Sequence, residues 1–234
     1  MLMTMPSPRN ISSPHAGGLP SLGGFAEPWR WVAYKLLLVS LGTAAFLGYY
    51  RMIALLAYGR SVDLMTAFDR AIPFVPWTWW IYVPAYALGL LVAIALIDDR
   101  RVLQRSMLAI LAIAGFNSIF YLTLPSTFPR PEVVLEPGWT AAAYAWLWAV
   151  DLPNNTFPSS HVAVGALSVF ITPIRRRPLA VIPLLCALAV SVTVLTTKQH
   201  YWIDSVSGWA VGGLAFWLIV RPVVPGHDEA RAPC

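Results

Sequence analysis

Six apolar stretches, separated by polar segments, set the pattern of this chain. They lie at about 31–50, 77–97, 106–124, 160–174, 178–197 and 201–220. Most approach the ~20 residues that an α-helix needs to cross the hydrocarbon core of a bilayer. The fourth stretch is the shortest, because Pro173 and the basic run 175–177 end it. The pattern therefore predicts an all-α polytopic membrane protein with six transmembrane helices.

The segments outside these stretches divide the chain into one membrane domain and two tails. Residues 1–28 are rich in Pro, Gly and Ser and predict a disordered cytoplasmic tail. We expect one six-helix domain over 29–222 and a second cytoplasmic tail over 223–234. Residues 51–76 carry several charges, and they predict an amphipathic connection that lies along the membrane surface.

The composition excludes a water-soluble fold. The 234 residues are 58% hydrophobic and only 12% charged, which is about half the charged fraction of a typical globular chain. The net charge of +5 does not indicate a nucleic acid partner, because the basic residues fall in short loops between apolar stretches. Two cysteines, Cys186 and Cys234, support neither a disulfide framework nor a cysteine metal site.

The basic residues orient the chain, since positively charged loops are retained in the cytoplasm. With both termini inside, 11 of the 16 Lys and Arg residues fall on the inner face. These are Arg9, Arg30, Lys35, Arg100, Arg101, Arg105, Arg175, Arg176, Arg177, Arg221 and Arg231. The outer face keeps Arg51, Arg60, Arg70, Arg130 and Lys198. We therefore expect a multi-pass protein of the cytoplasmic membrane with its N- and C-termini inside.

Candidate chemistry comes from polar residues at the outer ends of the spans, because ionisable groups at membrane depth usually mark a site. His200 and Asp204 are four residues apart, so on a helix they share one face. The carboxylate can then accept the imidazole N–H and leave the other ring nitrogen free as a nucleophile or base. Taken alone, this spacing is more typical of a structural pair than of a site.

A second histidine strengthens the signal. His161 precedes His200 by 39 residues. At about 1.5 Å per helical residue, that separation is close to two crossings of a ~30 Å core. One helix down and the next one up would therefore return both histidines to the same, outer face.

Groups that can hold phosphate lie near these histidines in the predicted topology. Ser159 and Ser160 stand where Pro158 allows a helix to begin, and the free N–H groups of a helix start form an anion site. Arg130 offers a planar fork of donors, and Lys198 offers a point charge. The combination predicts phosphoryl transfer, in which one histidine attacks phosphorus and the other protonates the leaving oxygen.

These residues resemble three motifs of the type 2 phosphatidic acid phosphatase superfamily, whose integral-membrane members have a six-helix core. Arg130-Pro131 is similar to the end of the first motif, Pro158-Ser159-Ser160-His161 to the second, and His200 with Asp204 to the third. The similarity covers about residues 64–220. It implies that His200 is the nucleophile that forms a phosphohistidine, that Asp204 orients it, and that His161 protonates the leaving group. It implies neither a metal nor another cofactor.

Phosphate binding departs from the pattern of this superfamily. Thr123 stands where the first motif has Lys, and Thr193-Val194 replaces the Ser-Arg of the third. Two phosphate-binding cations are therefore missing, and Lys198 would replace one of them if the last helix starts after it. The resemblance then implies that four residues hold phosphate: Arg130, Ser159, Ser160 and, on that condition, Lys198.

A divergent branch of the superfamily is a closer resemblance. Pro-Ser-Ser-His-Val-Ala together with Gln-His-Tyr-x-x-Asp resembles the branch that includes the inositol phosphorylceramide synthases and is related to the sphingomyelin synthases. Those enzymes of phospholipid and sphingolipid metabolism pass a phospho-headgroup to a lipid alcohol instead of water. The stretch 68–74 is also similar to this branch, and its Asp69-Arg70 pair is expected to be solvated on an interfacial helix.

The leading hypothesis is a metal-independent lipid phosphatase or lipid phosphotransferase at the outer face of the membrane. Its partners are a lipid phosphate or phospholipid and the bilayer, with either water or an alcohol as acceptor. One alternative makes His161, His200 and Asp204 the ligands of a divalent metal. Another is a small transporter or an inactive scaffold, which fits the missing cations but not the presence of all three residues that would make and break bonds.

Two further sets of polar residues are expected to be structural. Asn117 and Ser118 lie within the third apolar stretch and can pack against neighbouring helices. Glu132, Glu136 and Asp151 lie in the long outer loop, where carboxylates are expected to be solvated.

Overall fold

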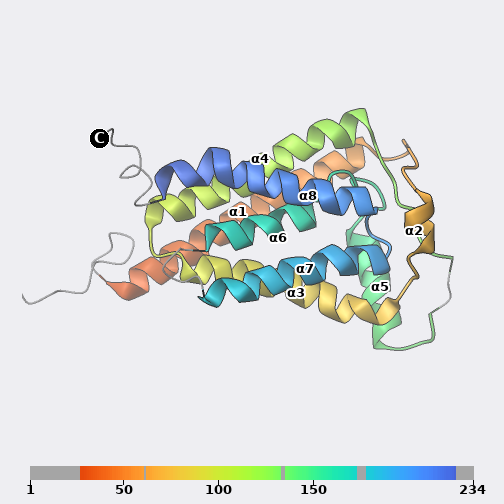
Figure 1. Cartoon of the computed structure of the whole chain (residues 1–234), viewed down its shortest axis with the longest axis horizontal. Helices are drawn as coiled ribbons and strands as arrows, with labels where there is room; N and C mark the ends of the chain where they lie inside the picture. The colour runs from red at the N-terminus through yellow and green to blue at the C-terminus, as the bar shows by residue number, and fades with distance from the viewer. Residues whose placement is uncertain (1–26, 61, 133–134, 173–177, 225–234) are drawn as a thin grey trace, which may run out of the picture.

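The computed structural model describes residues 27–60, 62–132, 135–172 and 178–224, and Figure 1 shows them as a bundle of helices. Most of the two predicted tails and the basic run 175–177 lie outside the described residues. The helices are α1 (Pro28–Leu56), α2 (Ala67–Ala71), η2 (Pro76–Thr78), α3 (Trp79–Leu96), α4 (Arg100–Thr123), α5 (Trp139–Val150), α6 (Ser160–Ile171), α7 (Val181–Thr196) and α8 (Trp202–Ala215). α8 continues through a π turn, η4 (Phe216–Val220), and a 3-10 turn, η5 (Arg221–Val223). The all-α prediction is confirmed for this part of the chain.

Five helical segments are long and apolar enough to cross a membrane. They are Pro28–Leu56, Pro76–Leu96, Arg100–Thr123, Pro178–Thr196 and Trp202–Val223. The remaining predicted span, 160–174, is the fourth along the chain and contains only α6. The 12 residues of α6 extend about 18 Å and fall short of a ~30 Å core. Ser159 caps α6 at its start, and Thr172 has already left the helical backbone at its end. Five of the six predicted spans therefore have the length to cross, and the fourth does not.

α1 presents apolar side chains outward along much of its length. Leu36, Leu37, Leu41 and Leu47 each expose more than half of their surface. A surface of this kind is stable against lipid and not against water. The apolar helices thus make this a membrane protein.

The connection after α1 differs from the prediction. Residues 51–56 are the last turns of α1, and only the remainder forms a connection. That connection contains α2, which begins with a capping box in which Thr66 and Asp69 bond to each other's backbone N–H groups. The side chain of Asp69 is only 2% exposed, whereas Arg70 is exposed. The expectation that Asp69 is solvated is therefore wrong, because its carboxylate is engaged by backbone groups.

The long loop between α4 and α6 contains a helix that the sequence analysis did not predict. α5 is an apolar run of 12 residues, shorter than a membrane span. Figure 1 shows α5 lying across the end of the bundle at which α2 also lies. α5 ends at Asp151, its C-cap residue, and this places Asp151 beside the helices that form the site.

α6 occupies the centre of the bundle, where it packs against α3, α4, α7 and α8. Its contact with α8 is the closest, because Gly208 and Gly212 of α8 face the backbone of α6. A Cβ atom on Gly208 would lie 2.8 Å from Cβ of Val162, and one on Gly212 would lie 2.3 Å from the carbonyl oxygen of Ala163. Two glycines four residues apart let the backbones of two helices approach in this way. The same approach brings the start of α8 to the start of α6, where the backbone N of Ser159 donates to the carbonyl of Asp204.

Candidate active site

The start of α6 is fixed by its serines. Oγ of Ser159, the N-cap residue, accepts from the backbone N of Val162. Oγ of Ser160 lies 2.9 Å from both Nδ2 of Asn117 and the hydroxyl oxygen of Tyr121 on α4. Both serines are buried, and their hydroxyls are already engaged. What this helix start offers to an anion is therefore its first backbone N–H groups, which lack intrahelical acceptors.

His161 is the second residue of α6 and is held between aromatic rings. Tyr82 and Tyr86 of α3 contact its imidazole in edge geometry, with ring centroids 5.6 and 5.3 Å away. Nδ1 of His161 lies 3.4 Å from Nε2 of His200. The two histidines that the sequence analysis predicted to share one face are thus in direct contact.

The four-residue spacing predicted that His200 and Asp204 share one helix. Instead, His200 lies in the turn before α8. The backbone N–H groups of Gln199 and His200 both donate to the carbonyl of Val194, which folds the chain back at the end of α7. Nδ1 of His200 lies 2.9 Å from the carbonyl oxygen of Thr156 and 3.2 Å from Oδ2 of Asp204. Both of these atoms are acceptors, so Nδ1 carries the proton and the lone pair lies on Nε2.

Asp204 reaches His200 because it occupies the first turn of α8. Its Oδ2 accepts from the backbone N of Tyr201 at 2.9 Å as well as from the imidazole. Its Oδ1 is buried and has no hydrogen-bond partner among the described residues. The carboxylate therefore holds the ring and can stabilise positive charge on it, as the resemblance implied.

Arg130 lies beside the turn that carries His200. Its guanidinium donates 3.0 Å to Oε1 of Gln199 and also donates to the backbone carbonyl of Asp151. The cation stands 5.8 Å from the ring centroid of Trp148 on α5. Burial lowers the pKa of Arg130 and the charge of Asp151 opposes that shift, but a guanidinium stays charged in proteins. Arg130, a predicted phosphate ligand, thus lies beside the turn that carries His200.

Lys198 points in another direction. Its Nζ donates 3.0 Å to the backbone carbonyl of Asp69 and also donates to the carbonyl of Ile72. These carbonyls belong to the C-terminal end of α2. Burial lowers the pKa of Lys198, and the charge of Asp69 opposes that shift. Its ammonium is thus engaged by α2, and a phosphate-binding role for it stays a prediction.

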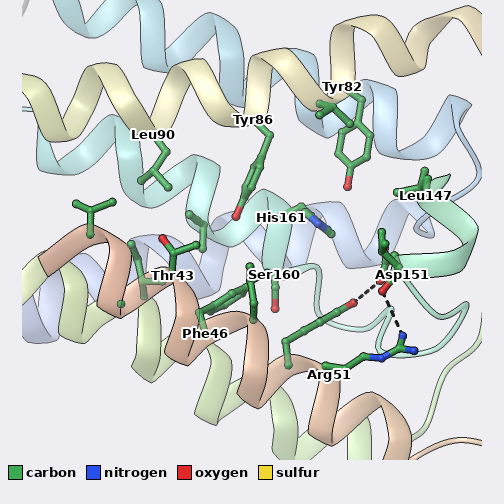
Figure 2. A pocket seen from close by; sticks show the side chains of 18 of the residues that line it. Thr43, Phe46, Arg51, Tyr82, Tyr86, Leu90, Leu147, Asp151, Ser160 and His161 are labelled. Carbon is green, nitrogen blue, oxygen red and sulfur yellow. Dashed lines mark hydrogen bonds between the residues drawn. The ribbon is translucent and has the colours of Figure 1, made fainter. Parts of the chain in front are cut away.

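A largely apolar cavity of about 580 Å³ reaches His161. Figure 2 shows Tyr86 and Leu90 of α3 entering it from one side, Phe46 of α1 from the other, and His161 between them. Deeper lining residues from α4 and α6 are apolar, including Met107. His161 therefore lies between this apolar space and the polar surroundings of His200.

Asp151 lies on the wall of this cavity. The hydroxyl of Tyr50 donates to its Oδ1 at 3.0 Å, and the residue is half-buried. Burial raises the pKa of the Asp151 carboxyl, and the charges of Arg130 and His200 oppose the shift. The expectation that Asp151 is solvated is wrong because α5 carries it inward, whereas Glu132 and Glu136 are exposed.

The residues proposed for a metal do not form a ligand set. No group of three or more His, Cys, Asp or Glu side chains that could hold an ion occurs within the described ranges. The reason lies in the geometry, since Asp204 bonds Nδ1 of His200 while His161 contacts Nε2, on the opposite side of the ring. A metal held between the two histidines would have no carboxylate beside it.

Residues 103–225 match the PAP2 superfamily. This protein belongs to the PAP2 superfamily. The superfamily includes phosphatases and phosphotransferases that act on lipid phosphate esters. The match begins within α4 and includes Arg130, the start of α6 and the turn with His200, whereas α1, α2 and α3 precede it. No curated protein matches the chain.

Several supporting residues of the site were not predicted. Thr156 holds Nδ1 of His200 through a carbonyl, which no sequence pattern signals. Gln199 contacts Arg130, and its place next to His200 was the only signal. Asn117 was expected to be structural, and it is, but its contact with Ser160 makes it part of the support of α6.

Proposed function

We propose that this PAP2 protein is a metal-independent lipid phosphatase or lipid phosphotransferase that works through a phosphohistidine on His200. The observation that carries the proposal is the contact between Nε2 of His200 and Nδ1 of His161, 3.4 Å apart, at the wall of an apolar cavity. Acceptors on the far side of the His200 ring hold its proton on Nδ1. Nε2 is therefore the free nucleophile.

The first half of the reaction cleaves the ester. Because 3.4 Å leaves no room for phosphorus on the line between the two nitrogens, the phosphate group parts the rings as it binds. The lone pair on Nε2 of His200 attacks phosphorus, and the P–O bond to the leaving group breaks. His161 takes up a proton as the anionic phosphate group binds beside it, and it gives that proton to the leaving oxygen. Positive charge on the phosphorylated His200 ring is balanced by Asp204.

The second half transfers the phospho group. Water or an alcohol attacks phosphorus and gives its proton to His161, now the base, while the P–N bond breaks and restores neutral His200. Arg130 and the first N–H groups of α6 hold the phosphate oxygens in both halves. The hydroxyls of Ser159 and Ser160 support this cradle by fixing the helix start.

The charge of the site favours a phosphodiester over a phosphomonoester. Thr123 is exposed and bonds to its own helix, and Thr193 is bonded likewise within α7, so neither replaces a cation of the family pattern. On the cavity wall the carboxylate of Asp151 offsets the charge of Arg51, so the two together add no net positive charge. A phosphodiester carries one negative charge, whereas a monoester carries close to two. The positive charge of Arg130 and a helix start therefore suits a phosphodiester better. This reasoning agrees with the resemblance to the phosphotransferase branch.

The lipid nature and the side of the reaction rest on separate arguments. The apolar cavity beside His161 fits the hydrocarbon part of a lipid substrate. The excess of basic residues in the predicted inner loops supports a site at the outer face of the cytoplasmic membrane, with both termini inside.

The test is an assay of full-length, detergent-purified protein in excess chelator. Phosphatidic acid and a phosphatidyl phosphodiester are each supplied with and without a long-chain alcohol, and products are identified by mass spectrometry. We expect turnover by the wild type, loss of turnover in His200→Ala, and an acid-labile, alkali-stable phosphoenzyme. His227→Ala, a change in the predicted C-terminal tail, is the matched control and should keep full activity.

Each outcome decides a specific point. Turnover that needs the alcohol identifies a phosphotransferase, and phosphate release without it identifies a phosphatase. Activity that disappears with chelator and returns with a divalent ion would favour the metal alternative. A wild type inactive on every pair would favour the transporter or scaffold alternative and would refute the proposal.

A further inference from the structure

The segment 66–72 overlaps the stretch 68–74 that is similar to the divergent branch, and it has no place in the reaction above. It contacts the turn of His200 directly. Oδ1 of Asp69 accepts from the backbone N of Trp202, the first residue of α8, at 2.8 Å. Oδ2 of the same carboxylate accepts from the backbone N and the hydroxyl of Thr66, at 2.9 and 2.6 Å. One buried side chain therefore caps α2 and holds the start of α8, 133 residues further along the chain.

Lys198 makes the reciprocal connection. Its Nζ donates to the carbonyls of Asp69 and Ile72 at the C-terminal end of α2, where a cation is favoured by the unpaired carbonyls of a helix. Its backbone φ of +56° lies in the left-handed region, which costs a residue with a side chain about 1 kcal/mol or more. The contacts of its ammonium help to offset that cost.

His200 stands midway between these two connections. Lys198 is two residues before it and Trp202 is two residues after it. Its own backbone N donates to Val194, and its ring is aligned by Thr156 and Asp204. A turn this short transmits a movement of either end to the imidazole, and reaction rates respond by about 100-fold to misplacement by 1 Å.

We propose that Asp69 and Lys198 form a clamp between α2 and the turn 197–202, and that this clamp positions Nε2 of His200 against His161. Both are positioning residues, and neither contacts the reacting atoms. Lys198 thus acts on His200 through α2 and is not a phosphate ligand. The inference rests on the proposed phosphohistidine reaction, and it extends the functional unit to α2, which precedes the residues that match the superfamily.

The test compares Asp69→Ala, Lys198→Met and the double variant in the assay above. We expect each single change to lower kcat by about tenfold or more, with KM and inhibition by vanadate, a phosphate mimic, changed less than about twofold. Because the two residues act through one clamp, the double variant should be no slower than the worse single variant. Lys198→Arg keeps a cationic donor and should restore most of kcat. Arg70→Met removes an exposed neighbouring cation and should behave as the wild type.

Two results would overturn the clamp. Unchanged kcat in Asp69→Ala and Lys198→Met, with a wild type that still depends on His200, would refute it and leave the proposed function standing. Vanadate inhibition weakened about tenfold or more in Lys198→Met alone would instead make Lys198 a phosphate ligand. If Asp69→Ala fails to fold, Asp69→Asn keeps the acceptor for Trp202 N and loses the one for Thr66 N. A partial loss of kcat at unchanged vanadate affinity in Asp69→Asn then supports the clamp, and wild-type kcat refutes it.

Discussion

Gly212→Ala tests whether the close approach of α6 and α8 sets the geometry of the histidine pair. His161 is on α6, and the carboxylate that aligns His200 is on α8. A Cβ atom at residue 212 would lie 2.3 Å from the carbonyl oxygen of Ala163, 3.0 Å from Cβ of Ala166 and 3.1 Å from the backbone N of Leu167. Two of these atoms belong to the backbone of α6, so the clash is relieved only by movement of a helix.

The magnitude follows from the distances. Ordinary contact begins near 3.4 Å, so α8 must move from α6 by about 1 Å at this point. Overpacking of this kind costs about 1–3 kcal/mol, while alanine gains up to about 1 kcal/mol over glycine in a helix. The net expectation is a loss of about 1–2 kcal/mol in the free energy of unfolding. The loss of activity is expected to be larger, about 100-fold in kcat, because 1 Å of separation falls between catalytic groups.

Gly213→Ala is the matched control. A Cβ atom at residue 213 would lie 3.6 Å from Cε2 of Phe170, which is ordinary contact, so this variant should keep full activity and equal or greater stability. The measurements are thermal unfolding in detergent and kcat for both variants on the same substrate. If Gly212→Ala is as active as Gly213→Ala, the helix contact does not set the site geometry and the reasoning fails.

Three further changes probe single groups of the site. Asp204→Asn should lower kcat by roughly 10- to 100-fold. This is less than the ~10⁴-fold loss seen when a triad carboxylate is replaced, because the carbonyl of Thr156 still holds the proton on Nδ1 of His200. An effect confined to KM would contradict this expectation. Arg130→Lys removes the planar fork and should weaken vanadate inhibition by about tenfold, or about 1.4 kcal/mol; unchanged inhibition would exclude Arg130 as a phosphate ligand. Burial raises the pKa of Asp151 above its ordinary value of 3.8, so the contribution of Asp151 to stability is greatest below that pH and falls as the pH rises through the higher folded-state pKa. Asp151→Asn should therefore unfold at a higher temperature than the wild type at pH 7, with the difference vanishing toward pH 4, and a wild type that is the more stable of the two at pH 7 would refute the shift.

The parts of the fold that sequence predicts are those set by the apolar pattern. Five stretches of spanning length are five helices of spanning length, because each must satisfy its backbone internally in lipid. His161 and His200 meet as predicted although α6 makes no full crossing of its own, because α7 returns the chain to the end of the bundle where α6 begins. α5 escaped prediction because a 12-residue apolar run matches neither a span nor a polar loop.

The contacts that complete the site join residues far apart in the chain, and no local pattern encodes them. Asp69 was expected to be solvated because an Asp-Arg pair on a short helix usually is. Its acceptor role toward Trp202 depends on where α8 begins. The direction of the Lys198 side chain depends on the left-handed backbone conformation of Lys198 itself. A lysine in the sequence does not indicate that conformation. Residue types and spacing thus predicted that the two histidines meet, whereas the support of His200 required the tertiary structure.

The short length of α6 has a physical reason that unites the fold and the site. Figure 1 shows α6 ending short of α4 and α8 at the end of the bundle where α2 lies, so its first turn begins inside the bundle. Unpaired N–H groups at such a depth are tolerated only where they face protein or a polar site. Here the first turn carries Ser160 and His161, which line the apolar cavity, and His161 contacts His200. A full-length span would carry this helix start away from the cavity and from His200, so the shortest apolar stretch is the one that brings the two histidines together.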